Sequence, residues 1–148
     1  MWQTVLIGAL YEYKPLQFGY FMSYKPAWDS AAKGLFTTIT AFNLNAAGGE
    51  STFTGLPAKY LVIALRAYDA SATPVAATAG LFTATGGGGT TVVTLATLLG
   101  LTAATKVSAM TIAATTDYLT APTLFLRNGT AQGTALTVSF QLQILDLT

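Results

Sequence analysis

Residues 135–145 read ALTVSFQLQIL, and their large apolar side chains fall at every second position. Successive side chains of a strand point to opposite faces, so this alternation is typical of a strand with one apolar face. The intervening Thr, Ser and Gln make its other face polar but uncharged. The stretch therefore predicts a half-buried strand.

Further strand signals precede it. Tyr60–Tyr68 is the strongest, because its first six residues are all apolar, and we expect it to be central and covered on both faces. Asn128-Gly129 predicts a hairpin turn before the final strand, because both residues tolerate positive φ. Residues 95–99 are expected to form one helical turn ended by Gly100. The remaining predicted strands are residues 35–44, 74–83, 91–95, 106–113 and 123–127.

Turn signals separate these strands at residues 46–51, 69–72 and 86–89. Regular strands with frequent turns and little helix predict an all-β fold, an antiparallel β-sandwich that is jelly-roll-like. A β-barrel is the alternative. We expect residues 35–148 to form the sandwich domain and residues 1–34 to form an aromatic-rich N-terminal segment or arm.

The first 28 residues hold eight of the 17 aromatic side chains. One interpretation is an arm that docks on a partner, since Tyr and Trp are favoured at interface cores. The other is that these side chains fill the core of the domain itself. The candidate interface residues are Trp2, Tyr11, Tyr13, Phe18, Tyr20, Phe21, Tyr24 and Trp28.

The chain has no histidine and no cysteine, and only 9% of its residues are charged. Average chains carry about 25% charged residues. Much of the surface is therefore expected to be covered by other subunits, although a Thr-rich β-surface can also be soluble. A net charge of +1 without a basic stripe predicts no nucleic-acid partner. Pro74, four consecutive glycines and many threonines interrupt the long uncharged stretch at residues 70–105, so no membrane span is predicted, and residues 1–4 lack the basic region of a secretion signal.

The composition predicts that the protein is not an enzyme. Without histidine, a Ser-His-Asp or Cys-His arrangement is impossible. Ser30 with Lys33, and Ser108 with Lys106, are formally possible Ser-Lys pairs, but we interpret them as surface residues. Paired-carboxylate catalysis needs two acids to converge, whereas the acids here lie far apart in sequence. They are Glu12, Asp29, Glu50, Asp69, Asp117 and Asp146.

No metal or cofactor site is predicted. Zinc prefers His and Cys, and no Asp/Asn cluster suits calcium beyond a lone candidate at Asp69 or Asp117. The glycines at 86–89 lack the Lys-Ser/Thr of a phosphate-binding loop. Arg66 interrupts an apolar strand, so we expect it to pair with an acid such as Asp69 or Asp117, or to reach a neighbouring subunit.

From about residue 61 onward the chain resembles small head-associated virion proteins of tailed phages, a family that includes capsid decoration proteins. The similarity covers roughly the last 60% of the sequence. It rests on Leu65-Arg66-Ala67-Tyr68-Asp69-Ala70, Thr73-Pro74-Val75, Gly80-Leu81-Phe82-Thr83-Ala84, the glycines before Thr90-Thr91-Val92-Val93, Leu101-Thr102-Ala103-Ala104-Thr105-Lys106-Val107, Tyr118-Leu119-Thr120-Ala121, Leu124-Phe125-Leu126 and Ala131-Gln132-Gly133.

The resemblance implies a virion structural protein, most simply a capsid decoration or cement protein that stabilises the phage head. Its partners would be the major capsid protein and further copies of itself, expected as a homo-trimer. It would be made in the host cytoplasm and reside on the capsid surface. A tail, neck or head-fibre component is the first alternative, and a carbohydrate-binding β-sandwich module is the second.

Overall fold

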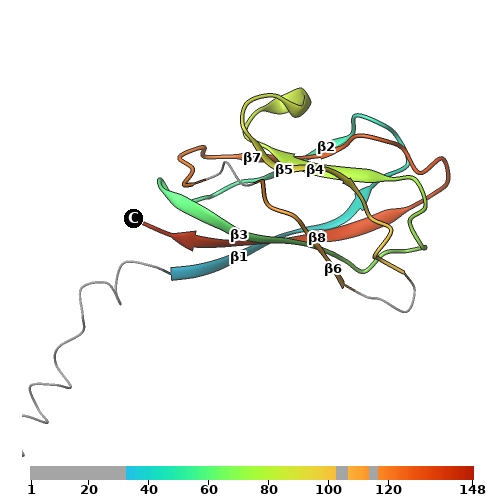
Figure 1. Cartoon of the computed structure of the whole chain (residues 1–148), viewed down its shortest axis with the longest axis horizontal. Helices are drawn as coiled ribbons and strands as arrows, with labels where there is room; N and C mark the ends of the chain where they lie inside the picture. Colours follow the sequence, from blue (N-terminus) through green and yellow to red (C-terminus); the bar gives the residue numbers. More distant parts are fainter. Residues whose placement is uncertain (1–32, 103–106, 114–116) are drawn as a thin grey trace, which may run out of the picture. The chain divides into compact units, whose positions relative to one another are not determined.

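The computed structural model describes residues 33–102, 107–113 and 117–148. Contacts divide the chain into Met1–Ala31 and Ala32–Thr148, and the described residues belong to the second unit. They form two antiparallel sheets of four strands each, which pack face to face (Figure 1). The predicted all-β antiparallel sandwich is confirmed.

The first sheet has the order β1-β8-β3-β6 and the second has the order β2-β7-β4-β5. The strands are β1 Lys33–Asn43, β2 Glu50–Phe53, β3 Tyr60–Tyr68, β4 Thr78–Phe82, β5 Thr91–Thr97, β6 Val107–Met110, β7 Leu124–Asn128 and β8 Thr137–Asp146. The antiparallel pairs are nested: β1 pairs with β8, β2 with β7, β3 with β6 and β4 with β5. This nesting supports the jelly-roll connectivity, which stays a prediction.

β8 has the one-sided character that its sequence predicts. It lies between β1 and β3, so its backbone hydrogen bonds are made on both edges. The alternating apolar residues at 136, 138, 140, 142 and 144 are all buried. The Phe140 ring packs edge-on against Phe42 of β1, with 6.1 Å between the ring centroids. β8 thus supplies the centre of the core from one sheet.

β3 is central, as predicted, but it is not covered on both faces. Its inward residues Tyr60, Val62, Leu65 and Ala67 are buried, whereas its other residues are at least partly exposed. The register with β8 shifts between Val62 and Ala64, and Ile63 at this bulge is 44% exposed. The prediction failed because an apolar run cannot reveal whether a second layer covers its outer face.

Asn128-Gly129 does not form the predicted hairpin turn. β7 and β8 belong to different sheets, so the segment between them crosses from one layer to the other. Asn128 is a fully buried residue of β7, and its Nδ2 donates to the Ala46 carbonyl oxygen at 2.7 Å. Neither Asn128 nor Gly129 has positive φ. The side chain therefore fixes the β1–β2 connection instead of making a turn.

The predicted helical turn at residues 95–99 is also wrong. β5 continues to Thr97, and only a tight turn follows, in which the Leu101 amide donates to the Leu98 carbonyl. β4 is shorter than predicted because residues 75–77 donate their three amides to one oxygen, the Oε1 of Gln132. Those amides are therefore taken from the sheet. β2 was not predicted, because four residues carry no clear periodicity.

Candidate functional site

The eight aromatic residues predicted as an interface lie outside the described residues. They are Trp2, Tyr11, Tyr13, Phe18, Tyr20, Phe21, Tyr24 and Trp28. The structure therefore leaves both interpretations of this segment as predictions. Ser30 and Lys106 lie outside the described residues as well, so neither Ser-Lys pair is described.

Within the described ranges, no group of three or more His, Cys, Asp or Glu side chains could hold a metal ion. No helix in the same ranges is long and apolar enough to cross a membrane. Glu50 forms an ion pair with Arg127, with 3.1 Å between Oε1 and Nη1. The sequence did not reveal this pair, because the two residues are 77 positions apart.

The outward side of the β1-β8-β3-β6 sheet is the most distinctive surface that the structure describes, and we call it the outer sheet face. The strand registers define it, since residues that lie opposite each other share a face. In β3 and β8 the outward pairs are Leu61 with Leu145, Ala64 with Gln143, Arg66 with Gln141 and Tyr68 with Ser139. Around them lie Phe36 and Thr38 of β1, Ile63 at the bulge, and Val107 and Ala109 of β6.

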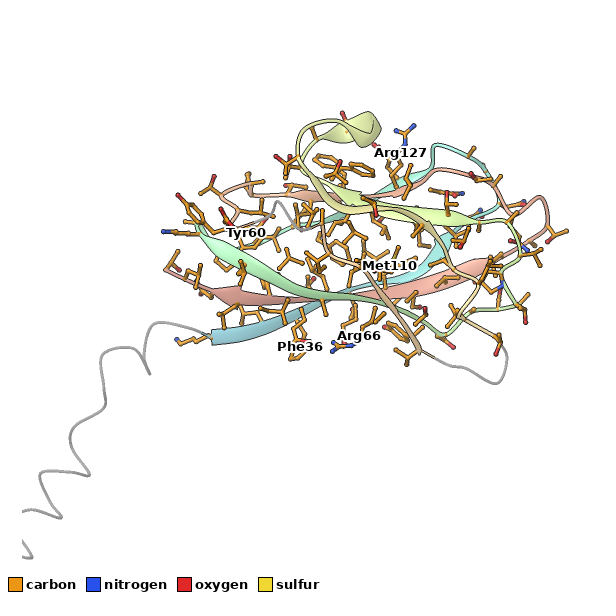
Figure 2. All side chains as sticks on the ribbon, in the orientation of Figure 1. Phe36, Tyr60, Arg66, Met110 and Arg127 are labelled. Carbon is orange, nitrogen blue, oxygen red and sulfur yellow. The ribbon has the colours of Figure 1, made fainter. Side chains whose placement is uncertain are left out.

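This face combines apolar and neutral polar side chains around one charge. Phe36 is 60% exposed and Val107 is 53% exposed. Figure 2 shows Phe36 and Arg66 on the side of the sheet that faces away from the second sheet, while Met110 lies between the sheets. Arg66 is the only charged residue among those that define the face. Aromatic residues and Arg are enriched at protein interfaces, and acidic residues and Lys are depleted.

Arg66 does not pair with an acid as expected. Its Nη1 instead donates to Oε1 of Gln143 on β8, at 3.0 Å. Among the described residues, the ion pair between Glu50 and Arg127 is the one within 4.0 Å. Asp69 and Asp117 lie in connections outside the strands, and the strand registers instead place Gln141 and Ala109 opposite Arg66.

A hollow of about 200 Å³ opens beside this guanidinium. Arg66, Tyr68, Val107 and Gln141 line it, and they come from three adjacent strands, β3, β6 and β8. Side chains on paired strands are held more firmly than side chains on loops. The hollow therefore presents a cation, a phenol, an amide and an apolar wall in a fixed arrangement.

The outward side of the second sheet is different, because the chain covers part of it. Residues 85–89, which we call the glycine loop, lie over this sheet at the place where Arg127 is labelled (Figure 2). The Gly86 amide donates to Glu50 Oε1 at 2.6 Å. A Cβ atom on Gly87 would lie 3.4 Å from Arg127 Cδ and 3.9 Å from the Phe82 ring. Glu50 and Arg127 therefore hold the glycine loop against the sheet.

A second hollow, of about 370 Å³, lies where β1 turns into β2. It is lined by residues 39–43, by Ala46 and by residues 49–51. Glu50 is its one charged lining residue, and that carboxylate is already bound to Arg127 and to the Gly86 amide. The charged group of this hollow is therefore already engaged, whereas Arg66 has no carboxylate partner among the described residues.

The outer sheet face was only partly foreseeable from the sequence. The polar side of the 135–145 alternation indicated Gln141 and Gln143, and the charge inside an apolar strand indicated Arg66. Phe36, Tyr68 and Val107 gave no signal, because their strands carry apolar residues on both sides. The sheet register alone brings these side chains together.

No protein-family model matches this sequence, and no curated protein matches it either. The similarity to phage head proteins thus stays a prediction.

Proposed function

We propose that this chain is a non-catalytic virion structural protein, a decoration or cement protein that binds the outside of a phage head. The observation that carries the binding role is the outer sheet face, where exposed Phe36 and Val107 share a face with Arg66, a cation that has no carboxylate partner among the described residues. Exposed apolar side chains on a charge-poor face favour burial against another subunit. The identity of the particle comes from the sequence resemblance.

The low charge of the whole chain supports the same proposal. A decoration protein needs a stable scaffold and contacts with capsid subunits and with its own copies, but no reactive groups. The strand β1 adds a second contact element, because it is an edge strand of its sheet and carries one charged residue, Lys33, in 11. An edge strand with so few charges can accept a strand from a neighbour. We propose the major capsid protein and further copies of this chain, as a trimer, as the partners.

Localisation in purified particles tests this proposal directly. Cryo-electron microscopy of particles should place the protein on the head lattice. Density at the neck, tail or fibre would select the alternative structural roles, and absence from particles would contradict a virion role altogether.

Binding to undecorated heads tests the outer sheet face. Phe36→Ser should weaken binding at least tenfold, because Phe36 is a large exposed aromatic on this face and truncation of an aromatic hot spot costs about 2 kcal/mol or more. Val75→Ser is the matched control, since Val75 is 69% exposed but lies on the connection before β4. Equal loss in both variants would count against the outer sheet face.

Deletion of residues 1–30 tests the aromatic arm separately, because full binding without it would exclude an arm-based attachment.

A carbohydrate-binding module is the second candidate. Phe36 and Tyr68 both lie on the outer sheet face with Gln141 and Gln143, and aromatic rings beside amides suit sugar recognition. Micromolar affinity of the isolated monomer for neutral glycans, with no binding to heads, would favour this candidate.

A further inference from the structure

The Arg66 guanidinium has a neutral partner in the structure, whereas the guanidinium of Arg127 has a carboxylate partner. In the described ranges it has no carboxylate within 4.0 Å, and its recorded side-chain partner is the neutral Gln143. A guanidinium has five N–H donors in a planar fork, and one bond to an amide oxygen leaves most of them for other partners. By comparison, Arg127 has a carboxylate partner and Lys59 lies 4.2 Å from the centre of the Tyr118 ring.

The hollow beside Arg66 is large enough for a small group. Its volume of about 200 Å³ exceeds the ~30 Å³ share of one water molecule several-fold, so a carboxyl group with its methylene stem fits. Tyr68 and Gln141 line the same hollow and carry O–H and N–H donors. Val107 supplies an apolar wall against which methylene groups can pack.

We propose that this hollow binds the carboxylate of an Asp or Glu side chain from a partner polypeptide. A guanidinium fork matches the two oxygens of a carboxylate, and such charge-assisted bonds are the strong ones. The bond to Gln143 already orients the guanidinium, and paired strands hold all four lining residues, so little ordering is needed on binding. Arg66 is the one cation among the four lining residues that the structure describes, and it matches one negative charge.

The surroundings favour a polypeptide over a free acid. Phe36 and Ile63 are exposed on the same face, and a free acid would leave them in water. A protein surface with one acidic side chain would bury these apolar groups and neutralise Arg66 at the same time. Excluding water around the ion pair would also strengthen it, as in the centre of an interface. This inference rests on the proposed function only for the identity of the partner.

A titration of the full chain tests the site without particles, followed by NMR of the Arg66 Nε–H signal and of the backbone amide signals of Tyr68 and Val107, which also line the hollow. The probe is N-acetyl-glutamate N-methylamide, and its glutamine counterpart is the neutral control of the same shape. We expect a saturable shift of the Arg66 signal with the glutamate probe. The glutamine probe should bind at least about tenfold more weakly than the glutamate probe. Arg66→Gln should abolish the probe-induced shift of the Tyr68 and Val107 amides, and Arg66→Lys should bind more weakly than wild type in the same amide signals, because Lys lacks the fork.

Lys59→Gln is the matched control, since it removes the same charge from outside the hollow and should leave binding unchanged. Thermal unfolding verifies that each variant is folded. If Arg66→Gln does not fold, Arg66→Lys together with Tyr68→Phe, which removes one donor from the hollow, carries the test.

The proposal would be overturned by no saturable shift in the wild type, by equal binding of both probes, or by equal loss in Lys59→Gln and Arg66→Gln. Binding of N-acetylneuraminic acid that is tenfold tighter than that of the glutamate probe would also overturn it, in favour of an acidic-sugar site. Because the titration uses no particles, the carboxylate site can stand even if the protein proves absent from virions.

Discussion

Arg66 and Arg127 occupy equivalent places in the two sheets, yet their surroundings differ. Each points outward from an inner strand, β3 or β7. Arg127 lies opposite Glu50 on one side and Gly80 on the other, and the glycine loop lies against it. Arg66 lies opposite Gln141 and Ala109, and its hollow is open.

The difference shows that the cross-strand neighbours of an arginine decide whether it forms an ion pair within the protein. An acid across the strand makes Arg127 an internal fastener, and its ion pair organises the loop that covers the second sheet. A neutral neighbour leaves Arg66 available to another molecule. The glycine loop therefore covers part of the outer side of one sheet, whereas no described residue pairs an acid with Arg66 on the outer side of the other.

The largest expected effect tests whether the outer sheet face is separate from the core. Leu142 is fully buried, whereas its neighbour Gln143 points to the outer sheet face. Leu142→Ala should lower the free energy of unfolding by about 2–5 kcal/mol, because it leaves a cavity. Gln143→Ala should lower it by less than about 1 kcal/mol. Urea denaturation measures both, and similar losses would mean that the outer sheet face is part of the stabilising core.

The next effect concerns the core between the two sheets, where Tyr60 makes the stability depend on pH. Burial raises the pKa of Tyr60 from 10.0 to about 12, and its hydroxyl donates to the Ala121 carbonyl at 2.8 Å. The raised pKa contributes stability that is fully present below pH 10 and is lost as the pH rises from 10 towards 12.

The loss at alkaline pH should reach roughly 2–3 kcal/mol, since each pKa unit is worth about 1.4 kcal/mol. Denaturant titrations from neutral to strongly alkaline pH measure it. Tyr60→Phe is the control, because it removes the titrating hydroxyl and should flatten this part of the profile. An unchanged profile in that variant would show that other groups cause the loss.

The next prediction compares a glycine of the glycine loop with a glycine of β1. Gly87 in the glycine loop has φ of +77°, so Gly87→Ala should lower the free energy of unfolding by about 1–2 kcal/mol. Gly34 in β1 has no atom within 4 Å of an added Cβ, so Gly34→Ala should change it by less than about 0.5 kcal/mol. Thermal unfolding compares the two. If Gly87→Ala is as mild as Gly34→Ala, the loop does not depend on this backbone conformation.

The smallest effect compares the arginines themselves. Arg127→Gln breaks a partly buried ion pair and should lower the free energy of unfolding by about 1 kcal/mol. Arg66→Gln breaks only a bond to an amide and should change it by less than about 0.5 kcal/mol. High salt should lower the free energy of unfolding of the wild type but not that of Arg127→Gln, because salt screens the ion pair between Arg127 and Glu50. Equal losses of unfolding free energy in both variants would show that the two arginines contribute equally to stability.

Much of the fold follows from local pattern. Tyr60–Tyr68 and the β8 stretch lie where the sequence predicts them, because alternation or an uninterrupted apolar run depends on neighbouring residues alone. The predictions that failed concern events between distant segments. Asn128-Gly129 has the sequence of a turn, but a buried bond to Ala46 and a crossing between sheets determine its conformation.

The candidate site was less predictable than the fold. The aromatic residues at 2–28 were the strongest signal for an interface, and they lie outside the described residues. Arg66 was noticed as an anomaly, but its partner was predicted wrongly. A sequence can mark an unusual residue, yet it cannot supply the neighbour that a strand register places beside it.

The sequence by itself determined that this protein is an all-β chain with an apolar side to its strands, few charges and no histidine or cysteine, since periodicity and composition are local properties. Only the tertiary structure decided which side of each sheet the described residues leave uncovered. Pairing brought Glu50 to Arg127 across 77 positions and left Arg66 beside Gln141 and Gln143. That outcome depends on strand register, in which a shift of one residue would reverse the face of every side chain.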